Sequence, residues 1–400
     1  MPIGVPEVVG GRPYTRRIMR FLHTADWQLG MTRHFLDADA QARYSAARRD
    51  AVSGLGALAA DTGAEFVVVA GDVFDANQLA PKVISQSLDA IRAIGVPVFL
   101  LPGNHDPLDA SSIYTSALFR RECPDNVTVL DRAGPFNIRP GVQIVAAPWR
   151  SKRPTADLTA EVVDGLPADG TVRILVAHGA VDALDPDKAN PALIRLAGLT
   201  AALDRSAIQY VALGDRHSRT ALGDSGRVWY SGSPEVTNYD HVERDSGHVL
   251  VVDIDVEDPA HPVDVEARTV GRWRFITLHR ELSDRRDIAD LDVNLDQLPD
   301  KDRTVVQLAL VGTLTVSDHA LLEAVLDRYA RLFACLGSWD RHTALAVMPS
   351  DDEFDDLDVG GFAAEAVAEL VQTARSGSAD AAAARQALAL LLRLREGRVA

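Results

Sequence analysis

Cysteine is scarce in this chain, which has two in 400 residues, Cys123 and Cys335. Two thiols cannot form a disulfide framework or a metal–thiolate cluster, so a disulfide-stapled fold and a thiolate-bound structural zinc are both excluded. No run approaches the roughly 18–20 apolar residues that a membrane span needs, and no apolar segment follows the basic residues Arg16, Arg17 and Arg20. We therefore expect a cytoplasmic protein with no membrane span and no secretion signal.

An excess of positive charge is also missing, because 41 Lys and Arg stand against 57 Asp and Glu, for a formal net charge of −16. This balance counts mildly against a nucleic-acid partner, since phosphate contacts come from Lys and Arg, but charge is local and the question stays open. A site that collects divalent cations needs carboxylates. The composition, 47% hydrophobic and 24% charged, is typical of a globular chain with two or three domains.

The first two thirds of the chain alternate apolar runs with helical patterns. Residues 1–18 are rich in Gly and Pro and predict a flexible arm. We expect helices at Ala38–Thr62 and Val83–Ile94, and strands at Phe21–His23, Phe66–Ala70, Val96–Leu101, Val127–Leu130, Val142–Ala147, Val172–Ala177, Tyr210–Leu213, Val228–Tyr230 and Val249–Ile254. Alternating β-α units that give way to a strand-rich half predict one α/β domain over 19–265, with two packed sheets and helices outside.

After residue 265 the pattern starts again. Strand-like runs at Arg272–Leu278, Thr304–Leu310 and Thr343–Met348, with a helix capped by Ser317 between them, predict a small α+β domain over 266–349. An acidic run and two Ala/Leu-rich helical stretches, Phe362–Ala374 and Ala381–Leu394, follow in 350–400. Two short helices on a tail more often dock onto a partner than stand alone.

Polar residues follow five of the apolar strands directly. The five motifs are Asp26-Trp27-Gln28, Gly71-Asp72-Val73-Phe74-Asp75, Gly103-Asn104-His105-Asp106, His178-Gly179 and Gly214-Asp215-Arg216-His217. In α/β proteins, chemistry gathers at the carboxyl ends of strands. Carboxylates, imidazoles and an amide oxygen are ligands for hard or borderline divalent metals, so Mn²⁺, Mg²⁺ or Fe is favoured over structural zinc. Two such ions can activate a water for attack on phosphorus.

Each motif alone has a plainer explanation. A single Asp after a strand is usually a turn or helix cap, and a His at a strand end, such as His178, is usually a hydrogen-bonded core residue. The ordered set of five favours a metal site. Basic residues such as Arg48 and Arg49 are expected on a solvated helix face. Arg216 and Arg219 are better candidates for phosphate contacts, and Trp27 could stack on a base or wall the site.

These motifs resemble those of the calcineurin-like metallophosphoesterases, and within them the bacterial SbcD-type DNA double-strand-break repair exonucleases. The resemblance covers about residues 19–350 and rests on His23-Thr24-Ala25-Asp26-Trp27, Gly71–Asp75, Gly103–Asp106 and Tyr230-Ser231-Gly232-Ser233-Pro234. It implies a four-layer fold of two packed β-sheets flanked by helices. It also implies that 266–349 is a capping domain and that the tail helices bind a coiled-coil SbcC-like ATPase subunit.

The resemblance implies roles for individual residues. The first metal would be held by Asp26, Gln28, Asp72 and His217, and the second by Asp72, Asn104, His178 and Asp215. His105 would stabilise the transition state or protonate the leaving oxygen, with Asp106 orienting its ring.

Two positions depart from the family pattern. Gln28 stands where the family has a His, and Asp215 replaces the first His of a Gly-His-x-His motif. Both changes exchange an imidazole for an oxygen donor, which favours Mn²⁺ or Mg²⁺ and predicts weaker binding of the first metal.

The predicted function is therefore a two-metal, Mn²⁺-dependent phosphodiesterase acting on DNA, an exonuclease subunit that forms a homodimer. Two alternatives stay open. One is a small-molecule or cyclic-nucleotide phosphoesterase, and the other is an activity-impaired scaffold that tethers DNA or the ATPase.

Overall fold

A computed structural model describes residues 18–258, 260–348 and 362–376, with six further positions between 380 and 388. The described residues form two compact units. The first comprises the chain up to Thr32, Ser45–Thr237 and Asp245–Arg272, and the second comprises Arg33–Tyr44, Asn238–Arg244 and the chain from Trp273 onward. The expected N-terminal arm lies outside the described residues except for Ile18, as do the acidic run and most of the second tail helix.

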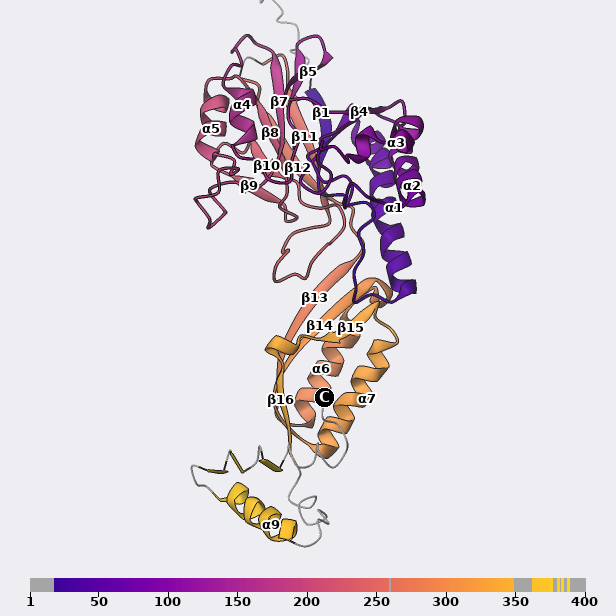
Figure 1. Ribbon diagram of the computed structural model, residues 1–400, viewed down its shortest axis with the longest axis vertical. Coiled ribbons are helices and arrows are strands. Elements are labelled where there is room, and N and C mark those ends of the chain that lie inside the picture. Colours follow the sequence, from indigo (N-terminus) through magenta and orange to yellow (C-terminus); the bar gives the residue numbers. More distant parts are fainter. Residues whose placement is uncertain are drawn as a thin grey trace, which may run out of the picture. The chain divides into compact units, whose positions relative to one another are not determined.

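The first unit contains two six-stranded sheets (Figure 1). The first sheet has the order β12-β11-β1-β2-β3-β4, from Val263–Thr269, His248–Asp255, Ile18–Thr24, Phe66–Val69, Val98–Leu100 and Val127–Val129. The second has the order β5-β6-β7-β8-β10-β9, from Gly134–Arg139, Val142–Ala147, Val172–His178, Tyr210–Gly214, Val228–Tyr230 and Thr220–Leu222. Strands β1 to β4 pair in parallel, and so do β6, β7 and β8, which brings their carboxyl ends to one edge of each sheet.

The two sheets pack face to face over a shared core. Phe21 of β1 and Phe66 of β2 stack at 5.1 Å between ring centroids and meet residues of the second sheet such as Ile174 and Tyr210. Every residue of β7 is buried, as expected for a central strand covered on both faces. The inter-sheet core therefore consists of alternate residues from the strands of both sheets.

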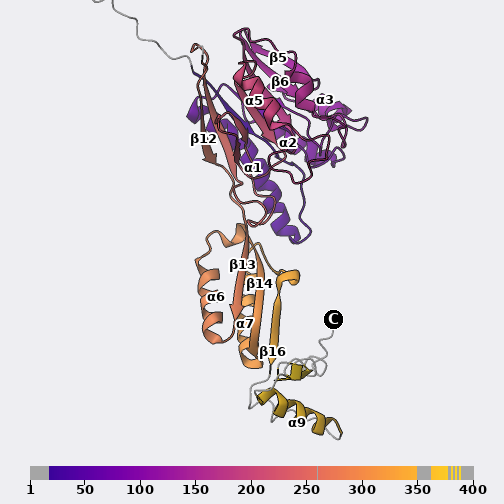
Figure 2. The same cartoon turned by 90° about the vertical axis from the view of Figure 1, so that its left-hand side faces the viewer.

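Helices cover the outer faces of the two sheets (Figures 1 and 2). Helices α1 (Ala38–Thr62) and α2 (Pro81–Arg92) pack Val52, Leu55 and Leu88 against one sheet. Helices α4 (Leu158–Val163) and α5 (Leu196–Asp204) pack against the other, and the short α3 spans Ala117–Glu122. The predicted four-layer α/β fold is confirmed.

The second unit is built on a parallel sheet. Its strands are β13 (Arg274–Leu282), β14 (Thr304–Thr315), β15 (Cys335–Ser338) and β16 (Ala344–Met348), with β14 in the centre. Helices α6 (Arg285–Gln297) and α7 (Val316–Ala330) contribute to one apolar core with these strands. The expected cap Ser317 is wrong, because the hydroxyl of Thr315 accepts the Asp318 N–H and α7 begins two residues earlier.

The described part of the tail contains helix α9 (Phe362–Arg375). Its Val367 and Val371 share a small apolar cluster with Ala384 and Leu388. Among the described residues, no helix is long and apolar enough to cross a membrane.

His23 belongs to β1, and its side chain is fully buried against β8. Its Nδ1 atom lies 3.0 Å from the Tyr210 hydroxyl, and its Nε2 atom lies 3.3 Å from the Leu213 carbonyl oxygen. Burial lowers the pKa of His23 to about 3. In the unfolded chain the His23 imidazole takes up a proton near pH 6.5, whereas in the folded chain it stays neutral at this pH. The free energy of unfolding therefore falls as pH drops below 6.5, by ~1.4 kcal/mol per pH unit. We expect His23→Gln to remove this dependence.

Urea titrations between pH 6 and pH 4.5 test the effect. His23→Gln should lose free energy of unfolding less steeply than wild type over this range. His34→Gln controls for the loss of an exposed imidazole. Parallel slopes for wild type and His23→Gln would contradict the prediction.

Candidate metal centre

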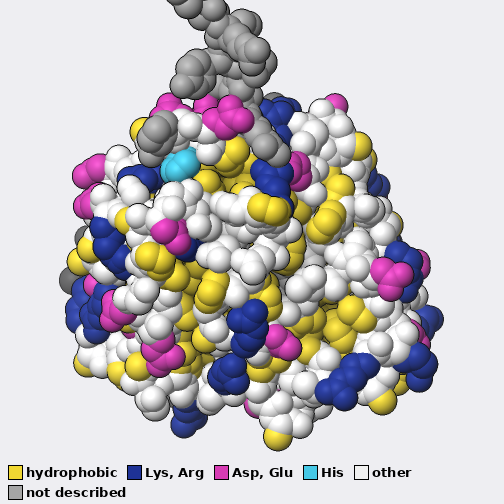
Figure 3. Space-filling view, turned by 90° about the horizontal axis from the view of Figure 1, so that it is seen from above, with side chains coloured by type: hydrophobic (Ala, Val, Ile, Leu, Met, Phe, Trp, Pro, Cys, Tyr) yellow, Lys and Arg dark blue, Asp and Glu magenta, His cyan; other side chains and the backbone are white. Residues whose placement is uncertain are grey.

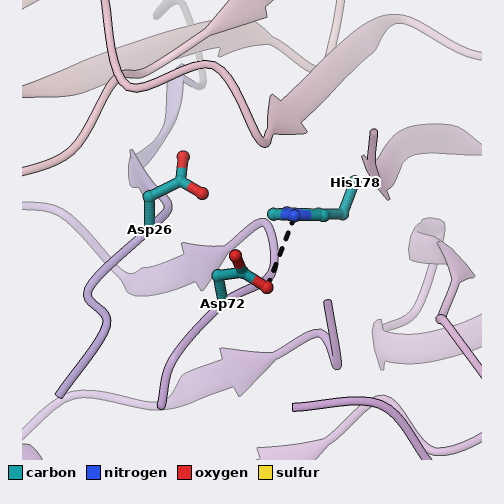
Figure 4. Close-up of side chains that lie close together, drawn as sticks. All are labelled: Asp26, Asp72 and His178. Atoms are coloured by element: carbon teal, nitrogen blue, oxygen red, sulfur yellow. Dashed lines mark ion pairs between the residues drawn. The ribbon is translucent and has the colours of Figure 1, made fainter. Parts of the chain in front are cut away.

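The predicted ligands follow strands that end at the same edges of the two sheets. Asp26 follows β1, Asp72 follows β2 and Asn104 follows β3 in the first sheet, while His178 ends β7 and Asp215 follows β8 in the second. Because the two sheets pack face to face, these loops converge. Figure 4 shows Asp26, Asp72 and His178 pointing toward one another from separate segments.

His178 lies at the centre of one group of donor atoms. Its Nε2 atom is 2.6 Å from the Asn104 amide oxygen, 3.4 Å from Asp72 Oδ1 and 3.8 Å from Asp215 Oδ1. Asp26, Asp72 and His178 each offer one ligand atom, and these three atoms lie within 4.8 Å of one another. All three residues are buried. This spacing suits a shared cation.

His217 lies in a second group beside Asp26. Its Nε2 atom is 3.9 Å from Asp26 Oδ1 and 3.3 Å from the Gln28 amide nitrogen. Asp26 itself accepts the backbone N–H of Asp215. The structure thus brings all seven predicted ligands to one place, with Asp26 and Asp72 between the two groups.

Each histidine is held by its other ring nitrogen. His178 Nδ1 lies 2.8 Å from the Ala70 carbonyl oxygen, and His217 Nδ1 lies 2.6 Å from the Thr237 hydroxyl. A carbonyl oxygen can only accept, so His178 carries a proton on Nδ1, and its Nε2 faces the oxygens of Asn104, Asp72 and Asp215. Histidines that bind metals are oriented in this way.

The backbone is strained at four of these positions. Asp26, Gln28, Asp72 and Asp215 have φ of 55°, 41°, 53° and 101°, and they are four of the seven described non-glycine residues with positive φ. Such conformations persist where the surroundings hold them, and they cluster at functional sites.

Two glycines allow the loops to approach one another. A Cβ atom on Gly71, whose φ is +98°, would lie 2.1 Å from His178 Nδ1. A Cβ on Gly103 would lie 2.2 Å from Asp72 Oδ1. Both glycines are therefore required by contacts between loops.

The electrostatics of the cluster favour a bound cation. Among the described residues, Asp26, Asp72 and Asp215 have no Lys or Arg ion-pair partner, and their ion-pair contacts are with histidines. Burial raises the pKa of Asp26 to about 6. Burial by itself would lower the pKa of His178, but the carboxylates of Asp72, Asp26 and Asp215 raise it to about 9. A divalent cation would offset this concentration of negative charge.

Gln28 provides a further test of whether the residues fit a metal. Its side chain is 2% exposed, and its Oε1 atom is buried with no hydrogen-bond partner in the described part of the chain. A buried acceptor without a donor is costly, and coordination would satisfy it. The donor set, made of carboxylate, amide and imidazole atoms, suits Mn²⁺ or a similar ion.

Replacing Gln28 by His tests the weaker donor at this position. We expect Gln28→His to raise Mn²⁺ affinity about tenfold, because an imidazole replaces a neutral amide oxygen and His tolerates positive φ. Isothermal titration calorimetry of both proteins measures the change. An unchanged or lower affinity would mean that the residue-28 side chain does not bind the ion.

The expected partner of His105 is corrected by the structure. His105 Nδ1 lies 2.8 Å from the carbonyl oxygen of Asp75 and 3.9 Å from its carboxylate, while Nε2 lies 3.8 Å from Asp72. Asp106 is fully buried and accepts hydrogen bonds from the Gly103 N–H, the Phe74 N–H and the Tyr114 hydroxyl. Asp75 therefore orients the ring, and Asp106 joins two of the loops.

The predicted substrate contacts differ in their exposure. Trp27 is 1% exposed and donates its indole N–H to Thr24, so stacking on a substrate base is ruled out. Arg219 forms an ion pair with Asp245, which neutralises its charge locally. Arg216 is exposed, bonds to Thr220, and remains a candidate for phosphate contact.

Sequence reasoning missed several residues that support the site. Arg48 was expected on a solvated helix face but is 2% exposed. Ser233 donates its hydroxyl to the carbonyl of Asp26. For Ser233 and Thr237, the nearby motif Tyr230–Pro234 was a signal, but no pattern in the sequence marks Arg48.

Solved structures resemble this fold at low similarity. They include the protein TT1561 of Thermus thermophilus, with 11% identity, a TM-score of 0.40 and coverage of 63% of this chain and 99% of that chain. Purple acid phosphatase PPD1 from yellow lupin seeds has 12% identity, a TM-score of 0.39 and coverage of 65% and 52%. Likeness at this level adds nothing to the assignment.

Sequence comparison is more informative. The chain is 36% identical over 98 residues to the SbcD subunit of the nuclease SbcCD from Bacillus subtilis, covering 24% of each chain. It is 27% identical over 283 residues to the protein of the same name in Rhodobacter capsulatus, covering 58% of this chain and 66% of that one. These matches thus span less than two thirds of either relative. Residues 19–196 match the family model described as calcineurin-like phosphoesterase. This match over residues 19–196 agrees with the calcineurin-like phosphoesterase family that the motifs of the chain predict.

Proposed function

We propose that this chain is a phosphodiesterase that hydrolyses DNA with two divalent cations, Mn²⁺ being the best suited. The observation that supports this most is the buried cluster of Asp26, Asp72 and His178, which gathers oxygen and imidazole donors without a neutralising Lys or Arg in the described residues. Cations bound there would lower the pKa of the attacking water and offset charge on the phosphate. The two bacterial relatives are named as nuclease subunits, which favours a nucleic acid among phosphodiester substrates. The resemblance of the motifs to those of the SbcD-type exonucleases favours DNA.

His105 is the group best placed to handle the leaving oxygen. Its side chain is 39% exposed beside the buried Asp72, so it can contact a substrate at the cluster. The Asp75 carbonyl accepts from Nδ1 and holds the ring with Nε2 toward the site. With both ring nitrogens protonated, His105 would donate a hydrogen bond or a proton from Nε2 to a phosphate oxygen.

The second unit and the tail have proposed roles that follow from the resemblance. We propose that residues 266–349 form a capping domain and that the helices after residue 350 bind a coiled-coil ATPase subunit. A homodimer and a cytoplasmic location belong to the same proposal. The relatives are named as one subunit of a larger nuclease, which supports a partner protein.

A second candidate function is supported by the two altered ligand positions and the charge distribution. Gln28 and Asp215 replace imidazoles of the family pattern, which favours a scaffold with impaired activity. Arg219 is already paired with Asp245. On the one face that Figure 3 shows, Lys and Arg are interspersed with Asp and Glu. A third candidate is an enzyme that hydrolyses a small phosphodiester such as a cyclic nucleotide. Weak affinity of the protein for DNA would favour this enzyme over both the exonuclease and the scaffold.

One set of assays separates these functions. The purified protein is incubated with Mn²⁺ and labelled linear DNA, bis(p-nitrophenyl) phosphate or cyclic AMP, with and without EDTA. We expect EDTA-sensitive degradation of DNA. Hydrolysis of cyclic AMP alone would indicate the small-molecule enzyme, and DNA binding without hydrolysis of any substrate would indicate the scaffold.

A further inference from the structure

Arg48 is a buried cation on α1 whose guanidinium donates to several backbone carbonyls. Nη2 lies 2.6 Å from the Trp27 carbonyl and 3.4 Å from that of Asp26, and Nε lies 3.2 Å from Trp27. Nη1 lies 3.2 Å from the Glu235 carbonyl and 3.4 Å from that of Val236. One side chain thus bonds to two segments that are about 200 residues apart in the sequence.

Both segments support ligands of the first cation. The first carries Asp26 and Gln28 on either side of Trp27. The second leads directly to Thr237, whose hydroxyl lies 2.6 Å from His217 Nδ1. Ser233 links the segments again, because its hydroxyl lies 3.0 Å from the Asp26 carbonyl and 2.7 Å from the Glu235 carbonyl.

The backbone around Trp27 requires such support. Asp26 and Gln28 both have positive φ, a conformation that side-chain-bearing residues leave unless other contacts hold it. Arg48 bonds to the two carbonyls within this strained turn, and a guanidinium presents its donors in a rigid planar fork. The side chain therefore fixes the direction in which the turn presents its two ligands.

We propose that Arg48 is a positioning residue that holds the ligands of the first cation, Asp26, Gln28 and His217, as one unit. This proposal rests on the proposed function, because it assumes that divalent cations bind the cluster. Under this proposal Arg48 supports only the first cation, because the second would be held by Asn104 and His178, which lie on other loops. Supporting residues of this kind change metal affinity ~10–100-fold.

The test compares Arg48→Met and Arg48→Lys with the matched control Arg49→Met. Arg49 is the next residue on α1 and forms none of these hydrogen bonds. Equilibrium dialysis gives the number of Mn²⁺ ions bound and their dissociation constants, and electron paramagnetic resonance distinguishes coupled from isolated Mn²⁺. We expect two ions in wild type and Arg49→Met. Arg48→Met should retain one ion and bind the other ~10–100-fold more weakly, and Arg48→Lys should recover part of that loss.

The outcomes are separable. Two ions bound with wild-type affinity in Arg48→Met, or equal weakening of both ions, would overturn the role of Arg48 and leave the proposed function intact. A wild-type protein that binds no Mn²⁺ would overturn both. If Arg48→Met fails to fold by circular dichroism, Arg48→Lys and Thr237→Val decide the matter, since each should weaken the first ion alone and unchanged binding in both would contradict the proposal.

Discussion

Replacing Asp72 by Asn is expected to abolish Mn²⁺-dependent phosphodiester hydrolysis, with a fall in kcat/KM of ~10³-fold or more, equivalent to about 4 kcal/mol. Asp72 is 2% exposed, and its oxygens lie 3.4 Å from His178 Nε2 and 3.8 Å from His105 Nε2. It therefore adjoins both a predicted ligand and the proposed acid. An amide here removes a negative charge beside both residues and would disturb the two proposed cations.

The measurement is hydrolysis of labelled DNA and of bis(p-nitrophenyl) phosphate at saturating Mn²⁺. Asp89→Asn is the matched control, because Asp89 is an exposed carboxylate on α2 whose partner is Arg92. We expect Asp89→Asn to keep wild-type rates. Hydrolysis that persists in Asp72→Asn would refute the metal mechanism, and circular dichroism would show whether a loss reflects unfolding.

Replacing Asp106 by Ala is expected to lower the free energy of unfolding by about 3 kcal/mol. The carboxylate accepts hydrogen bonds from the Gly103 N–H at 2.7 Å, the Phe74 N–H at 3.0 Å and the Tyr114 hydroxyl at 2.6 Å. Its loss would leave three buried donors without an acceptor in two of the loops that form the site. Urea denaturation followed by tryptophan fluorescence measures the change.

Two further variants separate this structural role from a catalytic one. Tyr114→Phe removes one donor together with its hydroxyl, so the loss should be only about 1 kcal/mol. Asp75→Ala changes the carboxylate that lies 3.9 Å from His105 Nδ1 and should affect stability less than Asp106→Ala. A stable Asp106→Ala protein with impaired hydrolysis would restore Asp106 as the partner of His105.

Much of the fold could be predicted because its central strands are short, apolar runs. β2, β6, β7 and β8 are buried on both faces and were predicted to within one or two residues. β5 and β12 were missed, because polar and apolar residues alternate along these partly exposed strands and form no apolar run. β9 and β15 are only three and four residues long and have no clear pattern.

The sequence by itself determined which residue types follow the central strands, and hence the family and the candidate ligands. Residues such as Asp72 and His178 adjoin strands whose apolar character is local, so their place at a sheet edge can be inferred without the fold. The tertiary structure decided what each polar group contacts. Arg48 bonds to carbonyls, Asp106 joins loops and Trp27 lies in the core. Burial and hydrogen-bond partners come from segments up to about 200 residues apart, and no local pattern encodes them.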